Sequence, residues 1–130
     1  MKLPEELREQ IACEAYNTAT QYVNSILGSP VIPTWEGAGT YTKERYYETL
    51  DFYFANPNST VIDLHDEYVR RAESAGYSIG KTYCTKKKTS PHLGPYVKMN
   101  LLVKIRDAVD HTIINTRLNE FLKGKGIQNG

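Results

Sequence analysis

The chain of 130 residues has little cysteine, little histidine and almost no net charge. Its two cysteines, Cys13 and Cys84, cannot form a disulfide framework and lack the spacing of a metal or redox pair. Sixteen basic and fifteen acidic residues leave a net charge of +1, which argues against a protein that mainly coats nucleic acid or an anionic membrane. We therefore expect neither a long nucleic acid nor a membrane among its partners.

Long apolar runs are missing too. No stretch reaches the roughly 18 apolar residues of a membrane span, and the first residues lack the apolar core of a signal peptide. A soluble cytoplasmic protein is therefore expected. With 40% hydrophobic and 24% charged residues, the composition is that of a globular chain with one domain, spanning residues 1–130.

Tyrosine is the residue in excess, with ten tyrosines beside three phenylalanines and one tryptophan. Tyrosine suits wet interfaces and ligand walls as readily as cores, so its abundance alone decides nothing. The single tryptophan, Trp35, falls in a segment rich in proline and glycine over residues 28–41. We expect Trp35 to anchor this loop to the core.

The spacing of apolar residues predicts a mainly α fold, a small bundle of about four helices with irregular loops and at most short strands. The expected helices run from Pro4 to a stop at Gly28, from the cap Thr42 to about Ala55, from the cap Thr60 to Gly76, and from the cap Asn100 to about Lys123. Residues 77–99 are expected to be irregular or briefly extended, and residues 124–130 to form a frayed tail.

All four helices have recognisable apolar faces. In the second helix the face is Tyr46, Tyr47, Leu50 and Phe54. In the first helix the face is Leu7, Ile11, Ala15, Ala19, Tyr22 and Ile26, and in the third it is Val61, Leu64, Tyr68 and Ala72. The last helix has two stripes, one of Leu102, Ile105, Val109 and Ile113 and the other of Ile114, Leu118, Phe121 and Leu122. We therefore expect this helix to be buried on both sides. We favour a second copy of the chain as the partner of one stripe, and the alternative is that the N-terminal helix covers both stripes.

Signatures of catalysis are lacking. The histidines His65, His92 and His111 lie in different expected elements without metal-ligand spacing, and no nucleophile elbow, Walker loop or dinucleotide fingerprint occurs. His111 follows Asp107 by one helical turn, which permits a local hydrogen bond. We therefore predict a protein that is not an enzyme and has no catalytic residue, no metal and no cofactor.

A basic segment with interleaved tyrosines is the best candidate for a ligand site. Four lysines (Lys81, Lys86, Lys87 and Lys88) follow Arg70 and Arg71, with Tyr77, Tyr83 and Tyr96 among them. Cations and hydroxyl donors on a loop bind phosphate, and aromatic rings stack on a base. The alternative is a solvated lysine run. Because the net charge is near zero, such a site suits a small anionic ligand better than a long duplex.

Two motifs in the same region carry a family resemblance. The first motif resembles a pattern of His-x-x-Trp, Gly-Trp and Tyr-Gly, and consists here of His65, Tyr68, Gly76-Tyr77 and Ile79-Gly80. The second motif runs from Lys88 to Tyr96 and is similar to Lys-Thr-His-Pro-x-Leu-Val-Pro-Tyr. Both patterns are those of the RyR domain, the repeat named after ryanodine receptors, and Asp107 falls where that family has a helix aspartate. The match is strongest over residues 65–107, and the upstream part resembles the small stand-alone bacterial and phage type.

The sequence departs from the family pattern at three telling positions. Tyr68 and Tyr77 replace the two tryptophans, and Ser90 replaces a histidine. Tyrosine keeps most of the aromatic area of tryptophan but adds a hydroxyl group that needs a partner or water. Any polar contact that the family makes through the histidine is therefore in doubt.

The resemblance implies a small helical binding module, because paired repeats in the channels can form a cleft suited to an adenine nucleotide. We predict non-catalytic binding of a small nucleotide-derived or phosphorylated ligand. If the protein comes from a phage, it would act in the bacterial host cytoplasm as a sponge or sensor for a cyclic nucleotide or cyclic ADP-ribose-type immune signal. The predicted ligand-binding residues are His65, Tyr68, Arg71, Tyr77, Lys81, Tyr83, Lys86, Lys88 and Tyr96. The alternative is a homo-oligomeric protein–protein adaptor with tyrosine anchors.

Overall fold

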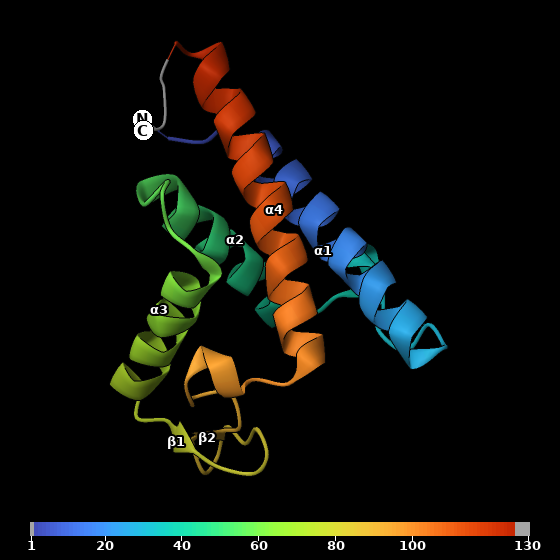
Figure 1. The fold of residues 1–130 in the computed structure, drawn as a ribbon, viewed down its shortest axis with the longest axis vertical. Helices are drawn as coiled ribbons and strands as arrows, with labels where there is room; N and C mark the ends of the chain where they lie inside the picture. Colours follow the sequence, from blue (N-terminus) through green and yellow to red (C-terminus); the bar gives the residue numbers. More distant parts are fainter. Residues whose placement is uncertain (1, 127–130) are drawn as a thin grey trace.

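The computed structural model describes residues 2–126 and consists mainly of helices (Figure 1). Along the chain it contains α1 (Glu5–Leu27), the 3-10 helix η1 (Trp35–Gly37), α2 (Thr40–Ala55), α3 (Val61–Ser74), β1 (Ser78–Ile79), β2 (Thr89–Ser90), the 3-10 helix η2 (Tyr96–Lys98) and α4 (Leu101–Gly124). β1 and β2 form a two-stranded parallel pair. The prediction of a small, mainly α bundle with four helices and short strands is confirmed. Within residues 2–126, no helix has the length and apolarity to cross a membrane.

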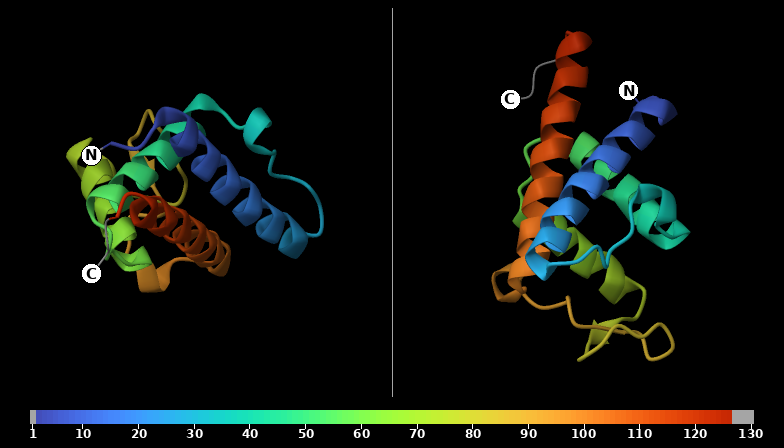
Figure 2. Two further views of the ribbon diagram at one scale, coloured as in Figure 1. Left: turned by 90° about the horizontal axis from the view of Figure 1, so that it is seen from above. Right: turned by 90° about the vertical axis from the view of Figure 1, so that its right-hand side faces the viewer.

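The first and last helices form the centre of the fold. α1 and α4 lie side by side and antiparallel, with α2 packed across them and α3 farther out (Figures 1 and 2). Small side chains on α1 (Ala12, Ala15 and Ala19) are fully buried, and small residues allow two helices to pack closely. The core is completed by Ile11, Tyr16, Trp35, Tyr46, Leu50, Tyr53, Ile114 and Leu118.

The predicted face of α1 is correct up to Ala19 and wrong beyond it. Tyr22 and Ile26 are both more than half exposed, whereas Val23 is buried. At 100° per residue, the face that begins with Tyr16 and Ala19 continues through Val23 and leaves Tyr22 about 100° away. The last turns of α1 therefore present apolar side chains to solvent.

The second helix begins three residues earlier than predicted. Thr42 is not its cap, because α2 starts at Thr40 and the capping residue is Gly39 in an extended conformation. The first turn is closed by backbone, with the Lys43 amide donating to the Gly39 carbonyl at 3.1 Å. No side chain caps this end of the helix, and Tyr41 becomes part of its first turn.

The two stripes of α4 are buried to different extents. Ile114, Leu118 and Leu122 are buried in contact with the rest of the chain, and Phe121 packs partly buried against Phe54. The stripe of Leu102, Ile105, Val109 and Ile113 is half-buried. A single chain therefore covers most of the second stripe, and association between copies stays a prediction. Gly124 belongs to α4, not to the predicted tail, of which residues 127–130 lie outside the described part.

Trp35 anchors the loop after α1 to the core, as predicted. Its side chain is buried and meets Tyr16, Tyr46 and Tyr47 edge-to-face at centroid distances of 5.7, 6.2 and 6.0 Å. Side chains of α1 also bind the loop backbone. Asn17 accepts a hydrogen bond from the Trp35 amide at 2.8 Å, and the Tyr16 hydroxyl donates to the Pro33 carbonyl at 2.8 Å.

α3 begins with the predicted capping box. The Asp63 amide donates to the Thr60 hydroxyl at 3.2 Å, and the Thr60 amide donates to the Asp63 carboxylate at 2.9 Å. The predicted face of α3 is only half-buried, and His65 is its one buried residue. α3 is therefore held less by core packing than the other helices, and its cap contributes a larger share of its stability.

Replacing Thr60 with alanine should lower the free energy of unfolding by about 1 kcal/mol, because the first turn of α3 loses its side-chain acceptor. Chemical denaturation followed by far-UV circular dichroism measures this change. The control is Thr112→Ala on the exposed side of α4, where the hydroxyl only donates to the Ala108 carbonyl of its own helix. Equal losses in the two variants would contradict a capping role.

Candidate functional site

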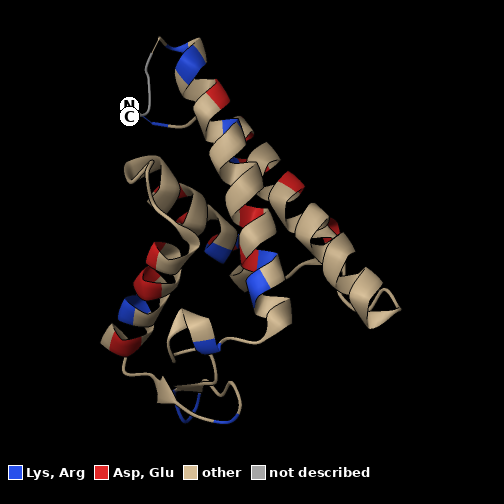
Figure 3. Ribbon diagram, viewed as in Figure 1, with Lys and Arg blue, Asp and Glu red and all other residues tan. Residues whose placement is uncertain are grey.

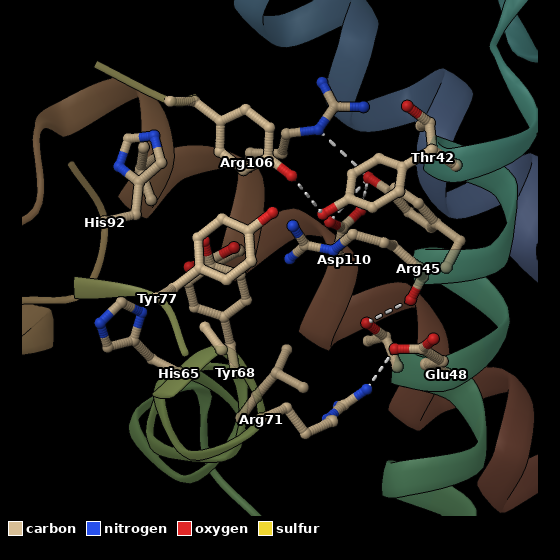
Figure 4. A pocket seen from close by; sticks show the side chains of 18 of the residues that line it. Thr42, Arg45, Glu48, His65, Tyr68, Arg71, Tyr77, His92, Arg106 and Asp110 are labelled. Atoms are coloured by element: carbon tan, nitrogen blue, oxygen red, sulfur yellow. Dashed lines mark hydrogen bonds and ion pairs between the residues drawn. The ribbon is translucent and has the colours of Figure 1, made fainter. Parts of the chain in front are cut away.

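A cavity of about 500 Å³ lies between α2, α3 and the first half of α4. Figure 4 shows side chains from all three helices, together with residues of the segment after α3, pointing into it. Its lining consists of Tyr41, Thr42, Arg45, Tyr46, Glu48, Thr49, Leu64, His65, Tyr68, Arg71, Ala72, Ala75, Tyr77, Tyr83, His92, Val103, Arg106, Asp107 and Asp110. The half-buried face of α3 is explained by this cavity, because Leu64, Tyr68 and Ala72 form one of its walls.

Five tyrosines contribute to the lining, of which Tyr46 is buried and the other four are more accessible. The Tyr77 and Tyr83 rings stack with centroids 6.0 Å apart and an interplanar angle of 19°. The Tyr83 hydroxyl donates to the Tyr41 hydroxyl at 3.4 Å, so the segment after α3 reaches α2. Tyr41 and Tyr83 are about half exposed and lie at the rim of the cavity, whereas Tyr68 and Tyr77 are half-buried.

Three arginines line the cavity, and they differ in their partners. Arg71 forms ion pairs with Glu48 and Glu67. Arg106 donates to the Tyr46 hydroxyl at 3.1 Å and to the Thr20 hydroxyl at 3.0 Å. Arg45 forms no ion pair within residues 2–126, and its guanidinium lies 4.5 Å from the centre of the Tyr68 ring. Arg45 and Arg106 are therefore the two cavity arginines that form no ion pair in residues 2–126, and Arg45 is the one whose guanidinium faces an aromatic ring of α3.

Asp110 is a buried carboxyl whose hydrogen bonds come from the protein. The Tyr46 hydroxyl donates to its two oxygens at 3.0 and 2.8 Å. Burial raises the pKa of Asp110 to about 8, an effect that the nearby Arg106 charge only partly offsets. Burial also raises the pKa of Tyr46 well above its ordinary value. At neutral pH both groups therefore keep their protons.

Asp107 lies one turn before Asp110 and has a different environment. It lines the cavity and forms no hydrogen bond or ion pair within the described part of the chain. Burial raises its pKa to about 6, against the opposing effects of His65, Arg45 and Arg106. The expected bond between Asp107 and His111 is absent here, because His111 Nδ1 lies 3.0 Å from the Tyr53 hydroxyl instead.

Five of the nine predicted ligand-binding residues line this cavity: His65, Tyr68, Arg71, Tyr77 and Tyr83. His65 Nε2 lies 2.7 Å from the Gly94 carbonyl oxygen, to which it donates, so this imidazole fixes the loop before η2. Tyr96 lies behind His65, with ring centroids 5.7 Å apart, and does not line the cavity. Tyr96 thus supports the wall from outside.

The predicted lysines are not part of the cavity lining. Lys81, Lys86 and Lys88 are exposed on the segment between β1 and β2, at the lower end of the molecule in Figure 3. Lys88 has a left-handed backbone with φ of 53°, and its Nζ donates to the Ala75 carbonyl at 2.9 Å. Lys88 therefore satisfies a carbonyl at the end of α3. The structure does not bring the lysine cluster and the tyrosines together in one cleft.

Tyr68 on α3 and Ser90 on β2 contact each other through their hydroxyl groups. The Tyr68 hydroxyl and the Ser90 hydroxyl lie 3.0 Å apart and share a hydrogen bond. Ser90 is buried at the end of β2, where it also accepts from the His92 amide at 3.2 Å. The hydroxyl of Tyr68 therefore has its hydrogen-bond partner in Ser90.

Sequence reasoning missed the two arginines that matter most in this cavity. Arg45 stands four residues after Tyr41, and Arg106 stands four residues before Asp110. Such spacings place each pair on one helix face, and the Arg106 face also contains the half-buried apolar stripe of α4. A basic residue on a predicted apolar face was the signal that could have found Arg106.

Comparison with known proteins yields no relative. No protein-family model, no curated protein and no solved structure matches this chain.

Proposed function

We propose that the cavity binds a small anionic ligand with a planar ring, such as a nucleotide or a cyclic nucleotide-derived signal, without transforming it. The observation that carries the proposal is Arg45, a guanidinium that stacks on Tyr68 at the cavity wall and has no carboxylate partner in residues 2–126. A guanidinium in this situation offers several N–H donors to a phosphate group and gains more from an anion than an arginine that is already paired.

The charge balance of the cavity favours an anion at neutral pH. Asp110 holds its proton, because burial raises its pKa to about 8, and Glu48 neutralises Arg71. Arg45 and Arg106 then outweigh Asp107, which leaves the lining positive. Charged groups in a partly enclosed site interact more strongly than at an open surface, so this local excess attracts anions although the whole chain is almost neutral.

The aromatic lining favours a ligand with a ring. The stacked pair of Tyr77 and Tyr83 and the neighbouring Tyr41 provide ring faces and edges at the rim. Base–tyrosine stacking contributes about 1 to 3 kcal/mol and does not depend on one particular base. A volume of about 500 Å³ lies within the range of small-molecule sites and can enclose much of a nucleotide. The resemblance to the RyR domain supports the same ligand class.

Replacing Arg45 with alanine should weaken binding of such a ligand by about 10- to 100-fold, which corresponds to the loss of hydrogen bonds to a charged group. Isothermal titration calorimetry with linear and cyclic nucleotides and cyclic ADP-ribose measures this change. Arg117→Ala is the matched control, because Arg117 pairs with Glu14 between α4 and α1 and does not line the cavity. Absence of binding to the wild-type protein, or equal weakening by both variants, would contradict the proposal.

A further inference from the structure

One carboxyl group in the cavity has hydrogen-bonding capacity that the protein does not use. Asp107 projects from α4 into the lining and forms no hydrogen bond or ion pair within residues 2–126. Asp110 on the same helix receives both of its hydrogen bonds from Tyr46. A partly buried carboxylate gains free energy from each donor it meets, so the free oxygens of Asp107 are suited to donors that come from outside the chain.

The neighbours of Asp107 restrict what those donors can be. Arg45, Arg106 and His65 are its electrostatic neighbours, and the two arginines are cations. A ligand with an ammonium group would meet these charges at close range, which costs free energy. Neutral hydroxyl or N–H groups avoid this cost and still donate to the carboxylate.

We propose that Asp107 accepts hydrogen bonds from a pair of neighbouring neutral donors on the same ligand whose anionic group binds Arg45. This inference rests on the proposed function and names its ligand class more closely. A carboxylate has two oxygens side by side, which match two donors on adjacent atoms. In nucleotides this chemistry has two sources, the 2′,3′-diol of ribose and the N–H pair on the base edge of guanine.

Four probes separate the two sources. GMP carries both the ribose diol and the N–H pair of guanine, whereas 2′-deoxyguanosine monophosphate carries only the N–H pair. AMP carries only the diol, and 2′-deoxyadenosine monophosphate carries neither. If Asp107 accepts from the diol, the protein should bind GMP and AMP at least about tenfold more tightly than the two deoxynucleotides. If Asp107 accepts from the base, it should bind the two guanine nucleotides at least about tenfold more tightly than the two adenine nucleotides. Equal affinity of the wild-type protein for all four probes would overturn the inference.

Asp107→Asn provides the second part of the test. The amide group of asparagine places a donor opposite one of the ligand donors, so the tenfold preference should disappear. Because the substitution also removes a negative charge from the cavity, the affinity for 2′-deoxyadenosine monophosphate should not fall and is expected to rise. Asp66→Asn on the exposed side of α3 is the control and should keep the preference. The thermal midpoint of Asp107→Asn should not fall, because Asp107 has no hydrogen bond in the protein to lose.

The outcomes distinguish the two proposals. If the four probes bind in an Arg45-dependent manner but Asp107→Asn keeps the preference, the inference on Asp107 is wrong and the anion site stands. If Asp107→Asn weakens all four probes equally, Asp107 does not read donors and the inference is again wrong. If none of the probes binds to the wild-type protein, the proposed function fails and the inference fails with it.

Discussion

Replacing Trp35 with alanine should lower the free energy of unfolding by about 3 to 5 kcal/mol, the usual cost of removing a buried aromatic side chain from a core. Trp35 is 5% exposed and contacts three tyrosine rings that come from α1 and α2. Its removal leaves a cavity where the loop after α1 meets both helices. The surrounding rings can collapse only partly, because Tyr16 and Tyr46 are held by hydrogen bonds of their own.

Urea denaturation followed by far-UV circular dichroism measures this loss without relying on the fluorescence of the residue that is removed. Val31→Ala is the control within the same loop, because Val31 is 63% exposed and should change stability by less than about 0.5 kcal/mol. A loss of about 1 kcal/mol or less for Trp35→Ala would mean that the loop does not depend on this anchor.

The free energy of unfolding should fall by about 2 kcal/mol between pH 6.5 and pH 8, because Asp110 loses its proton in the folded protein over this interval. Its pKa is about 8 in the fold and 3.8 in its ordinary state. A raised pKa means that the folded protein holds the proton more tightly than the unfolded chain does. The stabilisation is therefore complete below about pH 3.8 and decreases by up to about 1.4 kcal/mol per pH unit until pH 8.

Between pH 6.5 and 8 Asp110 has the largest effect on stability among the groups whose pKa is shifted. Asp107, with a pKa of about 6, is mostly ionised in this interval. Its loss of a proton also lowers the free energy of unfolding, but mainly at lower pH. Burial lowers the pKa of His92 and of His111 below the ordinary value of 6.5, so their effect has the opposite sign and fades as the pH rises above 6.5.

Asp110→Asn is the variant that tests this assignment. Asparagine cannot ionise but can still accept a hydrogen bond from the Tyr46 hydroxyl. Denaturation of both proteins at a series of pH values should show a falling free energy of unfolding for the wild-type protein and an almost constant one for the variant between pH 6.5 and 8. Parallel curves for the two proteins would show that another group is responsible.

The helices were predictable from the sequence because their signals are local. The capping box at Thr60 and the Asn100 cap are properties of a few neighbouring residues, and both occur in the structure. The predicted start of α2 was wrong because its N-cap residue is Gly39, which has no side chain that could indicate a cap in the sequence. The switch from Tyr22 to Val23 on α1 depends on what lies against the helix, which spacing alone does not reveal.

The candidate site was predictable only where its residues are close in sequence. His65, Tyr68, Arg71 and Tyr77 share α3 and its end, so one motif found them together. Arg45 and Arg106 are contributed by α2 and α4, and no local pattern connects them to α3. The lysines between β1 and β2 were predicted to belong to the site because their charge density is evident from the sequence. The direction in which their loop faces is not evident from the sequence.

The pairing of α1 with α4 has a consequence for the order in which the protein can fold. These helices are separated by most of the chain, so their contact is among the most distant in sequence that the fold contains. On the ribosome, α1 must wait with its alanine face uncovered until residues near Leu118 have been synthesised. The cavity is completed at the same late moment, because Arg106, Asp107 and Asp110 arrive with α4. Completion of the cavity and completion of the core are thus one event.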